Sequence, residues 1–545
     1  MSQNKSRVVE IMDTTLRDGE QTSGVAFSAS EKLSIARKLI DEVGVDRLEI
    51  ASARVSKGEF ECVQAVCEWA KEAGYLDRIE VLGFCDDGKS IEWIKSAGCK
   101  TINLLAKGSR KHCEGQLKKT PMEHWNDVAR NIRMASEAGL NVNIYLEDWS
   151  NGMQDDPDYV FGMLHRLEDY LYGYWETPDS DSMCQGYHID KMVSRVMLPD
   201  TLGILNPSKT KALISKMVEK HPILHFDFHA HNDYDLAVAN VLAAVEAGVK
   251  GVHTTINGLG ERAGNASLSS IVAVLNDMAD VCIGVEEKSI NQISRMVESY
   301  SGIATASNAP IIGENVFTQT AGVHADGDKK GKLYVNPLLP ERFGRSREYA
   351  LGKMSGKANI EQNLKLLGIH LNDNDMRRVT KRINEMGDKK EHVSIDDLPY
   401  IIADVLHHDI MSDRIKLLSY MVSTAYGLHP QACVKLEING QEFEESATGD
   451  GMYDAFVRAV RHIYRDKLGR KFPWLSNYVV TIPPGGRTDA LVQTTISWEF
   501  NGKTYRTRGL DADQTEAAIK ATIKLLNIVE EIYSEMESQQ DSFEQ

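Results

Sequence analysis

Residues Asp13-Thr14-Thr15-Leu16-Arg17-Asp18-Gly19-Glu20-Gln21 directly follow the apolar run Val8-Val9-Glu10-Ile11-Met12. A short run rich in β-branched residues that gives way to polar and charged ones is typical of a buried strand ending in a loop. This loop brings a guanidinium and carboxylates to the end of that strand. Arg17 is suited to bind a carboxylate or an oxyanion, and Asp18 to bind a metal. The alternative is a solvated loop with an Arg–Asp ion pair.

Similar apolar runs recur along the first half of the chain and alternate with helix-period segments. They cover residues 8–12, 45–51, 79–84, 101–105, 142–146, 195–198, 224–229 and 251–256. Segment 30–43, with Ser30 predicted as its N-cap, is one of the intervening helices. Eight strands alternating with helices over residues 8–285 favour a (β/α)8 TIM barrel over an open doubly wound sheet.

Polar and charged residues follow one predicted strand after another. They are Arg17 and Asp18, Glu49, Glu147 and Asp148, Asp200 and Thr201, His229 and His231, and Asn257. In a TIM barrel the C-terminal ends of the strands lie at one face and carry the active site. The recurrence therefore predicts that these residues converge on one site.

Composition narrows the class of protein. The chain has 545 residues, too many for one core, and a formal net charge of −17. The negative charge argues against a nucleic-acid or anionic-membrane partner. The sequence shows no membrane-span-length apolar run and no signal peptide. Its eight scattered cysteines, without a CxxC pair, indicate reduced thiols in a cytoplasmic protein.

The pattern changes after the barrel and predicts further domains. We expect a catalytic barrel at 1–285, helical linker subdomains at 286–414, an α+β domain at 415–535 and a disordered polar tail at 536–545. In the α+β domain, strands are predicted at 432–438, 478–482 and 490–500, and helices at 453–468 and 514–533. Residues 172–189 are interpreted as an inserted loop before the sixth barrel strand.

His229 and His231 are the best candidates for metal ligands. They lie two residues apart on a predicted strand, so their side chains point to the same face. Asp18, at the matching end of the first strand, supplies a third ligand, and water or substrate takes the open positions. A mixed nitrogen and oxygen set accepts zinc, manganese, magnesium, iron or cobalt, so the sequence does not identify the divalent metal.

The stretch Gly258-Leu259-Gly260-Glu261-Arg262-Ala263-Gly264-Asn265 follows the eighth strand. As a dinucleotide-binding GxGxxG it is weak, because the third glycine is misplaced. As a flexible loop after strand eight it lies where barrels commonly bind phosphates. Asn265 is interpreted either as turning towards the metal or as an ordinary helix N-cap. By composition alone, His324 in a polar loop is a solvated surface group rather than a base.

Residues 13–21, 229–233 and 258–265 resemble the α-isopropylmalate synthase and homocitrate synthase family. The resemblance covers nearly the whole chain, because 449–455 and 485–490 are similar to the family's allosteric amino-acid-binding domain. Within the family, 49–59, 145–152 and 317–331 are most similar to the bacterial (R)-citramalate synthases. The chain departs from the family pattern in the 172–189 insert and at Lys332, where a smaller polar residue contacting the thioester is expected.

The resemblance implies a condensation of acetyl-CoA with a 2-oxo acid at a divalent metal, followed by hydrolysis of the thioester. Asp18, His229 and His231 would bind the metal, with Asn265 as a further ligand. Arg17 would stabilise the alkoxide at C2, Thr201 would bind the carboxylate of pyruvate, and Glu147 would orient groups around the reacting carbon. The resemblance assigns the base that removes a proton from acetyl-CoA to His324 with Asp326 and Tyr334.

The choice of oxo acid is predicted to depend on Leu82, Leu105 and Tyr145, at the ends of strands three, four and five. Large apolar side chains there leave room for a methyl group and crowd an isopropyl group. Packing of a barrel layer explains the two leucines equally well. The resemblance to citramalate synthases favours pyruvate over 2-oxoisovalerate. Pyruvate is converted to citramalate for isoleucine biosynthesis, whereas 2-oxoisovalerate is the substrate of 2-isopropylmalate synthases.

The resemblance also implies that the C-terminal domain mediates feedback inhibition by isoleucine, or alternatively by leucine. In such a domain the resemblance implies a binding surface that includes Tyr453, Asp454 and the turn at 483–489 and lies between the paired domains of a homodimer. Two other functions remain as alternatives. One is a catalytically silent amino-acid sensor, which would have no reason to keep six catalytic-type residues. The other is a hydroxymethylglutaryl-CoA lyase, which would lack the C-terminal domain.

Overall fold

The computed structural model describes most of the chain as two compact units. The described residues are 7–171, 193–319, 331, 333, 335–352, 355–366, 369, 371–388, 393, 398, 401, 402, 405, 414–481, 492–501 and 503–543. The first unit comprises the described parts of Met1–Thr318 and Tyr334–Glu348. The second comprises those of Gln319–Leu333 and Tyr349–Gln545. The predicted boundaries at 285 and 414 stay predictions.

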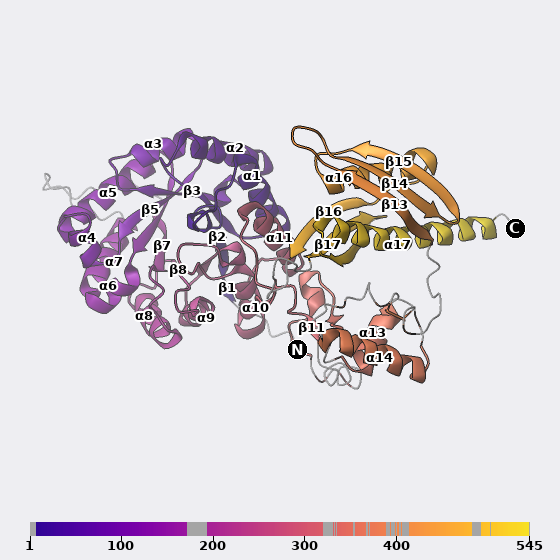
Figure 1. The fold of residues 1–545 in the computed structure, drawn as a ribbon. Helices are drawn as coiled ribbons and strands as arrows, with labels where there is room; N and C mark the ends of the chain where they lie inside the picture. Colours follow the sequence, from indigo (N-terminus) through magenta and orange to yellow (C-terminus); the bar gives the residue numbers. More distant parts are fainter. Residues whose placement is uncertain are drawn as a thin grey trace, which may run out of the picture. The chain divides into compact units, whose positions relative to one another are not determined.

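The first unit contains the predicted barrel (Figure 1). Its parallel strands, in barrel order, are β2 (Glu10–Asp13), β3 (Arg47–Ser52), β4 (Ile79–Phe84), β5 (Thr101–Lys107), β6 (Asn141–Glu147), β7 (Val193–Asp200), β8 (Phe226–Ala230) and β9 (Gly251–Thr254). β9 pairs with β2 and closes the barrel. The fold prediction is confirmed, and each strand covers most of its predicted run.

The first predicted strand is divided into two. β1 (Arg7–Val8) pairs with β10 (Val281–Cys282) outside the barrel, and only β2 belongs to the barrel sheet. The chain changes partner at Val9 and Glu10, whose N–H groups donate to Cys282 O at 3.0 Å and Lys250 O at 2.9 Å. An apolar run alone does not reveal such a change of partner, because it indicates burial and not which strand each residue pairs with.

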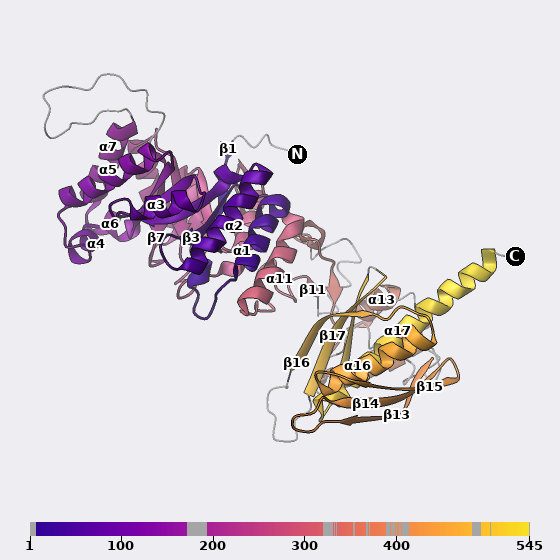
Figure 2. The same ribbon diagram turned by 90° about the horizontal axis from the view of Figure 1, so that it is seen from above.

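Helices surround the barrel sheet in both views (Figures 1 and 2). They are α1 (Ala29–Arg37), η2 (Lys38–Val43), α2 (Lys57–Ala73), α3 (Lys89–Ser96), α4 (Arg110–Gly115), α5 (Pro121–Glu137), α6 (Trp149–Asp155), α7 (Pro157–Leu171), α8 (Pro207–Lys220), α9 (Ala237–Ala247), α10 (Leu268–Met278) and α11 (Ile290–Ser301). The predicted N-cap of α1 is wrong. Ser28, not Ser30, caps the helix in a reciprocal capping box with Glu31.

Side chains that point into the barrel fill it in layers. At the N-terminal end, Arg47 forms buried ion pairs with Glu80 (3.0 Å) and with Asp227. Above them lies an apolar cluster of Met12, Leu82, Tyr145 and Met197, with Leu105 packed against it. The interior is therefore a packed core, and space for chemistry remains at the C-terminal ends of the strands.

The second unit contains an α+β fold and a smaller helical part. Two three-stranded antiparallel sheets, with their own apolar core, pack with two helices. The elements are β13 (Ile415–Ser423), β14 (Gln431–Ile438), β15 (Gln441–Thr448), α16 (Met452–His462), β16 (Trp474–Thr481), β17 (Val492–Phe500), β18 (Lys503–Asp511) and α17 (Gln514–Phe543). The helices α13 (Lys357–Leu366) and α14 (Asp373–Asp388) belong to a separate apolar cluster.

The tail prediction needs correction, because α17 continues to Phe543. The segment predicted to be disordered is rich in Glu, Gln and Ser and extends a helix that is already formed. Elongation of an existing helix avoids the cost of nucleation, so polar residues with adequate helix propensity continue it. Within the described residues, every helix is too short or too polar to cross a membrane.

Candidate metal centre

Asp18, His229 and His231 come together at the C-terminal end of the barrel, as the sequence predicts. One ligand-type atom from each lies within 4.8 Å of the others. Asp18 Oδ2 is 3.1 Å from His229 Nε2 and 3.9 Å from His231 Nε2, and the two Nε2 atoms are 3.3 Å apart. All three side chains are buried. One carboxylate and two imidazoles converging in this way form a set that suits a divalent cation.

Backbone hydrogen bonds explain why these side chains converge. After β2 the chain turns around the Thr14 carbonyl, which accepts the N–H groups of Arg17 (3.2 Å), Asp18 (2.8 Å) and Gly19 (3.1 Å). β8 ends at Ala230, but His231 continues the extended chain through an antiparallel bridge to Asn265. Both imidazoles therefore point to the same side.

Asn265 is not the N-cap of the following helix, because α10 begins at Leu268 with Ser267 as its N-cap. Its Nδ2 donates to Leu259 O at 3.0 Å. Its buried Oδ1, like Asp18 Oδ1, has no hydrogen-bond partner among the described residues. A Cβ at Gly260 would lie 2.3 Å from Asn265 Nδ2, so glycine permits this close approach. A free amide oxygen beside His231 fits the predicted further ligand, which stays a prediction.

The charges around Asp18 and His231 favour the protonation states that bind a cation. Burial alone would raise the pKa of Asp18, but Arg17 and a hydrogen bond from His229 hold that pKa well below its usual range. Burial, reinforced by His229, lowers the pKa of His231 to about 4. Near neutral pH, Asp18 is therefore ionised and His231 is neutral, the forms in which both side chains bind metals.

Arg17 lies beside the candidate ligands and is held by a buried carboxylate. Glu49 Oε2 accepts from Arg17 Nε at 2.6 Å and lies 2.6 Å from Nη2, while Nη1 is 3.5 Å from Asp18 Oδ2. Thr14 Oγ1 and Asn103 Nδ2 donate to the same Glu49 carboxylate at 2.7 and 2.8 Å. Because Glu49 holds one edge of the guanidinium, Nη1 is directed towards the Asp18 side.

Two other predicted residues lie on neighbouring strand ends. Glu147, at the end of β6, forms an ion pair with Lys107 of β5. Thr201 Oγ1 accepts the N–H of Asp148 at 2.9 Å, and Asp148 has a φ of 66°. The left-handed conformation at Asp148 aims its N–H at Thr201, which leaves the Thr201 hydroxyl hydrogen available to another acceptor.

Leu82 and Tyr145 belong to the barrel-interior layer, with the partly exposed Leu105 against them. The Tyr145 hydroxyl lies 3.0 Å from His253 Nδ1 and accepts from Arg17 Nη2 at 3.3 Å. Tyr145 therefore both packs in the interior layer and contacts Arg17. Their part in choosing the oxo acid stays a prediction.

Several predicted residues lie outside the described part of the chain. These are His324, Asp326, Lys332, Tyr334, the turn at 483–489 and the 172–189 insert. Tyr453 and Asp454 are described at the start of α16. The Tyr453 hydroxyl is 2.7 Å from Thr522 Oγ1, and Asp454 Oδ2 is 2.8 Å from Arg458 Nη2. Both residues therefore have partners within their own fold.

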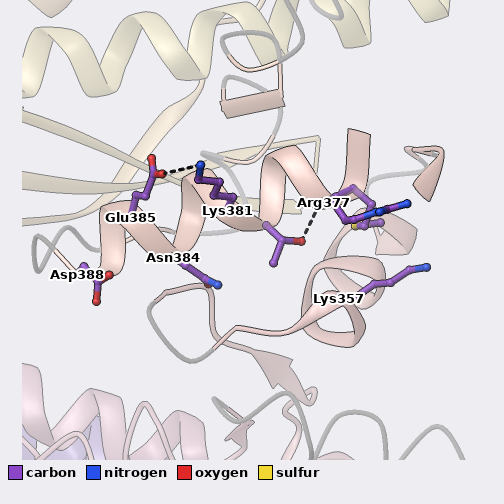
Figure 3. Close-up of a pocket in the computed structure, with 8 residues that line it drawn as sticks. Lys357, Arg377, Lys381, Asn384, Glu385 and Asp388 are labelled. Atoms are coloured by element: carbon purple, nitrogen blue, oxygen red, sulfur yellow. Dashed lines mark hydrogen bonds and ion pairs between the residues drawn. The ribbon is translucent and has the colours of Figure 1, made fainter. Parts of the chain in front are cut away.

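A hollow beside α13 and α14 is lined by charged side chains (Figure 3). Basic Lys357, Arg377 and Lys381 line it, yet acidic residues accompany them. Lys357 Nζ is 2.5 Å from Asp373 Oδ1, and Lys381 Nζ is 3.9 Å from Glu385 Oε1. These pairs resemble ordinary solvated ion pairs on a helix surface, and we assign no site to the hollow.

Two residues of the site, Glu49 and Lys107, have no specific role predicted from the sequence. Glu49 stands out only as one polar residue after a strand, and its partnership with Arg17 depends on the β2–β3 pairing. Lys107 follows Asn103 and Leu105 at alternate positions of β5, so strand periodicity indicates that it points into the barrel mouth. This alternation along β5 is the sequence signal from which Lys107 could have been predicted.

Three family models match successive parts of the chain. Residues 8–297 match the HMGL-like family, 311–391 the homocitrate synthase post-HMGL domain-like family, and 392–530 the LeuA allosteric (dimerisation) domain. The last match agrees with the regulatory type predicted for the C-terminal domain. It gives no information about the amino acid that such a domain would bind.

Curated relatives carry two different names at similar identity. The probable 2-isopropylmalate synthase of Methanopyrus kandleri is 34% identical, covering 95% of this chain and 98% of its own length. The (R)-citramalate synthase of Methanocaldococcus jannaschii is 32% identical, covering 96% and 99%. The 2-isopropylmalate synthase of that organism is 33% identical, covering 95% and 94%. Overall identity therefore does not separate the two substrates.

Proposed function

The chain belongs to the HMGL-like family and is a condensing enzyme of the transferase type, and from this premise we propose that it is an (R)-citramalate synthase. It would condense acetyl-CoA with pyruvate and hydrolyse the thioester to citramalate and CoA. The observation that carries the proposal is the buried set of Asp18, His229 and His231 with the Arg17 guanidinium beside it. Acidic, imidazole and guanidinium groups in this arrangement suit a 2-oxo acid whose keto oxygen becomes an alkoxide.

Asp18, His229 and His231 would hold the divalent metal, with Asn265 as a further ligand. When bound, such a cation supplies Lewis acidity towards a keto oxygen and a carboxylate. Arg17 Nη1 would donate to the oxyanion that develops when the keto carbon is attacked, because Glu49 directs that nitrogen to the Asp18 side.

Thr201, Lys107, Glu147 and the predicted base would complete the site. The Thr201 hydroxyl would donate to the carboxylate of the oxo acid, while the Asp148 N–H holds its oxygen. The Lys107–Glu147 ion pair would orient the reacting groups at the barrel mouth. His324, with Asp326 and Tyr334, would remove the methyl proton of acetyl-CoA, and this assignment depends on the family resemblance alone.

Pyruvate is favoured as the oxo acid by the side chains beneath Arg17. Leu82, Leu105 and Tyr145 pack there with two methionines, so an isopropyl group would have to displace a filled layer. Overpacking of a filled interior costs roughly 1–3 kcal/mol, equivalent to about one or two orders of magnitude in relative rate. The relatives named 2-isopropylmalate synthase make 2-oxoisovalerate the second candidate.

A panel of oxo acids tests the proposal. Purified enzyme would be assayed for CoA thiol release from acetyl-CoA with pyruvate, 2-oxobutyrate, 2-oxoisovalerate and 2-oxoglutarate. We expect the highest kcat/KM with pyruvate. A preference for 2-oxoisovalerate would replace the proposal by 2-isopropylmalate synthesis, and absence of turnover with all four acids would refute the condensing reaction for these substrates.

Leu82→Ala and Tyr145→Ala should each raise the rate with 2-oxobutyrate or 2-oxoisovalerate relative to pyruvate. Each substitution shortens a side chain of the layer beneath Arg17 and so leaves more space for the side chain of the oxo acid. The ratio of kcat/KM values measures the effect. Leu104→Ala is the matched control, since Leu104 is equally buried but packs in the barrel–helix core. An unchanged ratio in both variants, or an equal change in the control, would place the selectivity elsewhere.

We further propose that the C-terminal domain makes the enzyme a homodimer inhibited by isoleucine, with leucine as the alternative effector. A coupling free energy of ~1–3 kcal/mol would be enough for effective inhibition. Millimolar isoleucine should slow the full-length enzyme, and Asp454→Asn should raise the half-inhibitory concentration with little change in the uninhibited rate. Valine serves as a control. Indifference to both isoleucine and leucine would refute the regulatory proposal and leave the catalytic one intact.

A further inference from the structure

A buried lysine lies behind the loop that carries Arg17 and Asp18. Lys32 is on α1, on the helix face that buries Ile35 and Ala36 against the barrel. Its side chain is 1% exposed and is among the largest fully buried side chains of the described chain. Burial of an unpaired ammonium is very unfavourable, so such a lysine persists only with hydrogen-bond acceptors around it.

Four acceptors surround the Lys32 ammonium, and they come from different parts of the barrel. Nζ is 3.1 Å from Leu16 O, 3.2 Å from Ile50 O, 2.7 Å from Glu20 Oε2 and 2.5 Å from Glu59 Oε1. We call these four residues and Lys32 the lysine clamp. An ammonium has three N–H donors, so all of them are used and none remains for a substrate.

The two carbonyls of the lysine clamp flank the pair that orients Arg17. Leu16 immediately precedes Arg17, and Ile50 immediately follows Glu49, whose carboxylate holds the Arg17 guanidinium at 2.6 Å. Glu20 links the Lys32 ammonium to a further part of the backbone, because its Oε1 accepts the N–H of Phe27 at 2.8 Å. One ammonium therefore joins the backbone on both sides of the Arg17–Glu49 pair.

We propose that Lys32 is a positioning residue for the condensation, which acts by holding the Arg17–Glu49 pair in register through the Leu16 and Ile50 carbonyls. The proposal rests on the proposed function in assigning Arg17 to the developing oxyanion. Packing alone does not explain the residue. An apolar side chain of similar length, such as methionine, would fill the same space without burying a charge.

Lys32→Met tests the proposal, with Lys57→Met as the matched control. Lys57 also pairs with a glutamate, Glu61 at 3.4 Å, but its side chain is 91% exposed. At saturating Mn²⁺, Lys32→Met should lower kcat about 10–100-fold, the range seen when residues that support active-site groups are lost. The control should stay within about twofold of the parent. The assay uses whichever oxo acid of the panel the parent enzyme turns over, so inactivity of the parent is a failure of the proposed function only.

A double-mutant cycle with Arg17→Ala separates positioning from a general structural role. If Lys32 acts through Arg17, Lys32→Met should change the rate of the Arg17→Ala enzyme by no more than about threefold. Calorimetric affinity for the hydroxy acid made from that oxo acid, which is citramalate in the case of pyruvate, should follow the same pattern. It should be weakened by Lys32→Met only when Arg17 is present. A full 10–100-fold loss in both backgrounds, or unchanged kinetics of Lys32→Met, would overturn the proposal.

Lys32→Met leaves Glu20 and Glu59 without their shared cation, so the variant enzyme is checked for folding by circular dichroism. If it does not fold, Glu59→Gln takes its place in the cycle. Glu59→Gln keeps the shape of the side chain and removes one charge from the lysine clamp. The expected loss is then about tenfold and again confined to enzyme that retains Arg17. Equal losses in both backgrounds would again refute the positioning role.

Discussion

His231→Ala should remove both the bound divalent cation and the condensation activity. His231 Nε2 is one of three ligand-type atoms that converge within 4.8 Å, and its removal leaves a two-residue set that holds a cation poorly. Lewis-acid assistance is worth several kcal/mol, so kcat should fall roughly 10³-fold or more. Metal content after dialysis and thiol release with pyruvate measure the two effects.

The fold should survive this change, because Asp18 keeps its contacts with His229 and Arg17. His165→Ala is a suitable control, since His165 lies on the surface of α7 with a side chain that is 77% exposed. The control should keep its metal and its rate. Stoichiometric metal in dialysed His231→Ala would show that the ligand assignment is wrong, whatever the activity of that variant.

Arg17→Ala should lower kcat by roughly 10²–10³-fold while leaving metal content unchanged. That range is typical of losing one oxyanion donor. The reason lies in the geometry, because Nη1 faces the Asp18 side and Glu49 holds the opposite edge of the guanidinium. Steady-state rates at saturating Mn²⁺ and pyruvate, with metal analysis of the same preparation, give the measurement. Near-normal turnover would exclude Arg17 from the mechanism.

Truncation of Arg17 also leaves Glu49 buried without its cation. Breaking a buried ion pair in this way costs about 3–5 kcal/mol, so thermal unfolding must be compared alongside the rate. Arg17→Met combined with Glu49→Gln removes both charges and should recover much of that stability without recovering the rate. Arg130→Ala, on the exposed face of α5, is the control for loss of an arginine. Recovery of the rate together with stability would mean that Arg17 acts only through the fold.

The sequence alone was sufficient to predict the barrel fold. It was also sufficient to predict which kinds of side chain lie at the C-terminal ends of its strands. Alternating apolar runs and helix-period segments specify strands and helices, because burial on both faces of a parallel strand demands continuous apolar residues. The sequence also contains the correct start of helix α1. Ser28 and Glu31 have the spacing of a capping box, and this pair rather than Ser30 begins α1. Three C-terminal strands, β13, β15 and β18, were missed, because exposed or mixed polar strands have weaker periodicity.

The tertiary structure alone decided which of these groups meet. Sequence spacing brings His229 and His231 to one side of β8, but closure of the barrel through β9 is what brings Asp18, more than 200 residues earlier in the chain, to 3.1 Å from His229. The same holds for Glu49 beneath Arg17 and for Lys32 behind both. A lysine in an amphipathic helix pattern normally indicates a solvated face. Only the packing of α1 against the β2 loop and β3 turns Lys32 inward, where the cost of burying its charge is balanced by four acceptors that are distant from it in sequence.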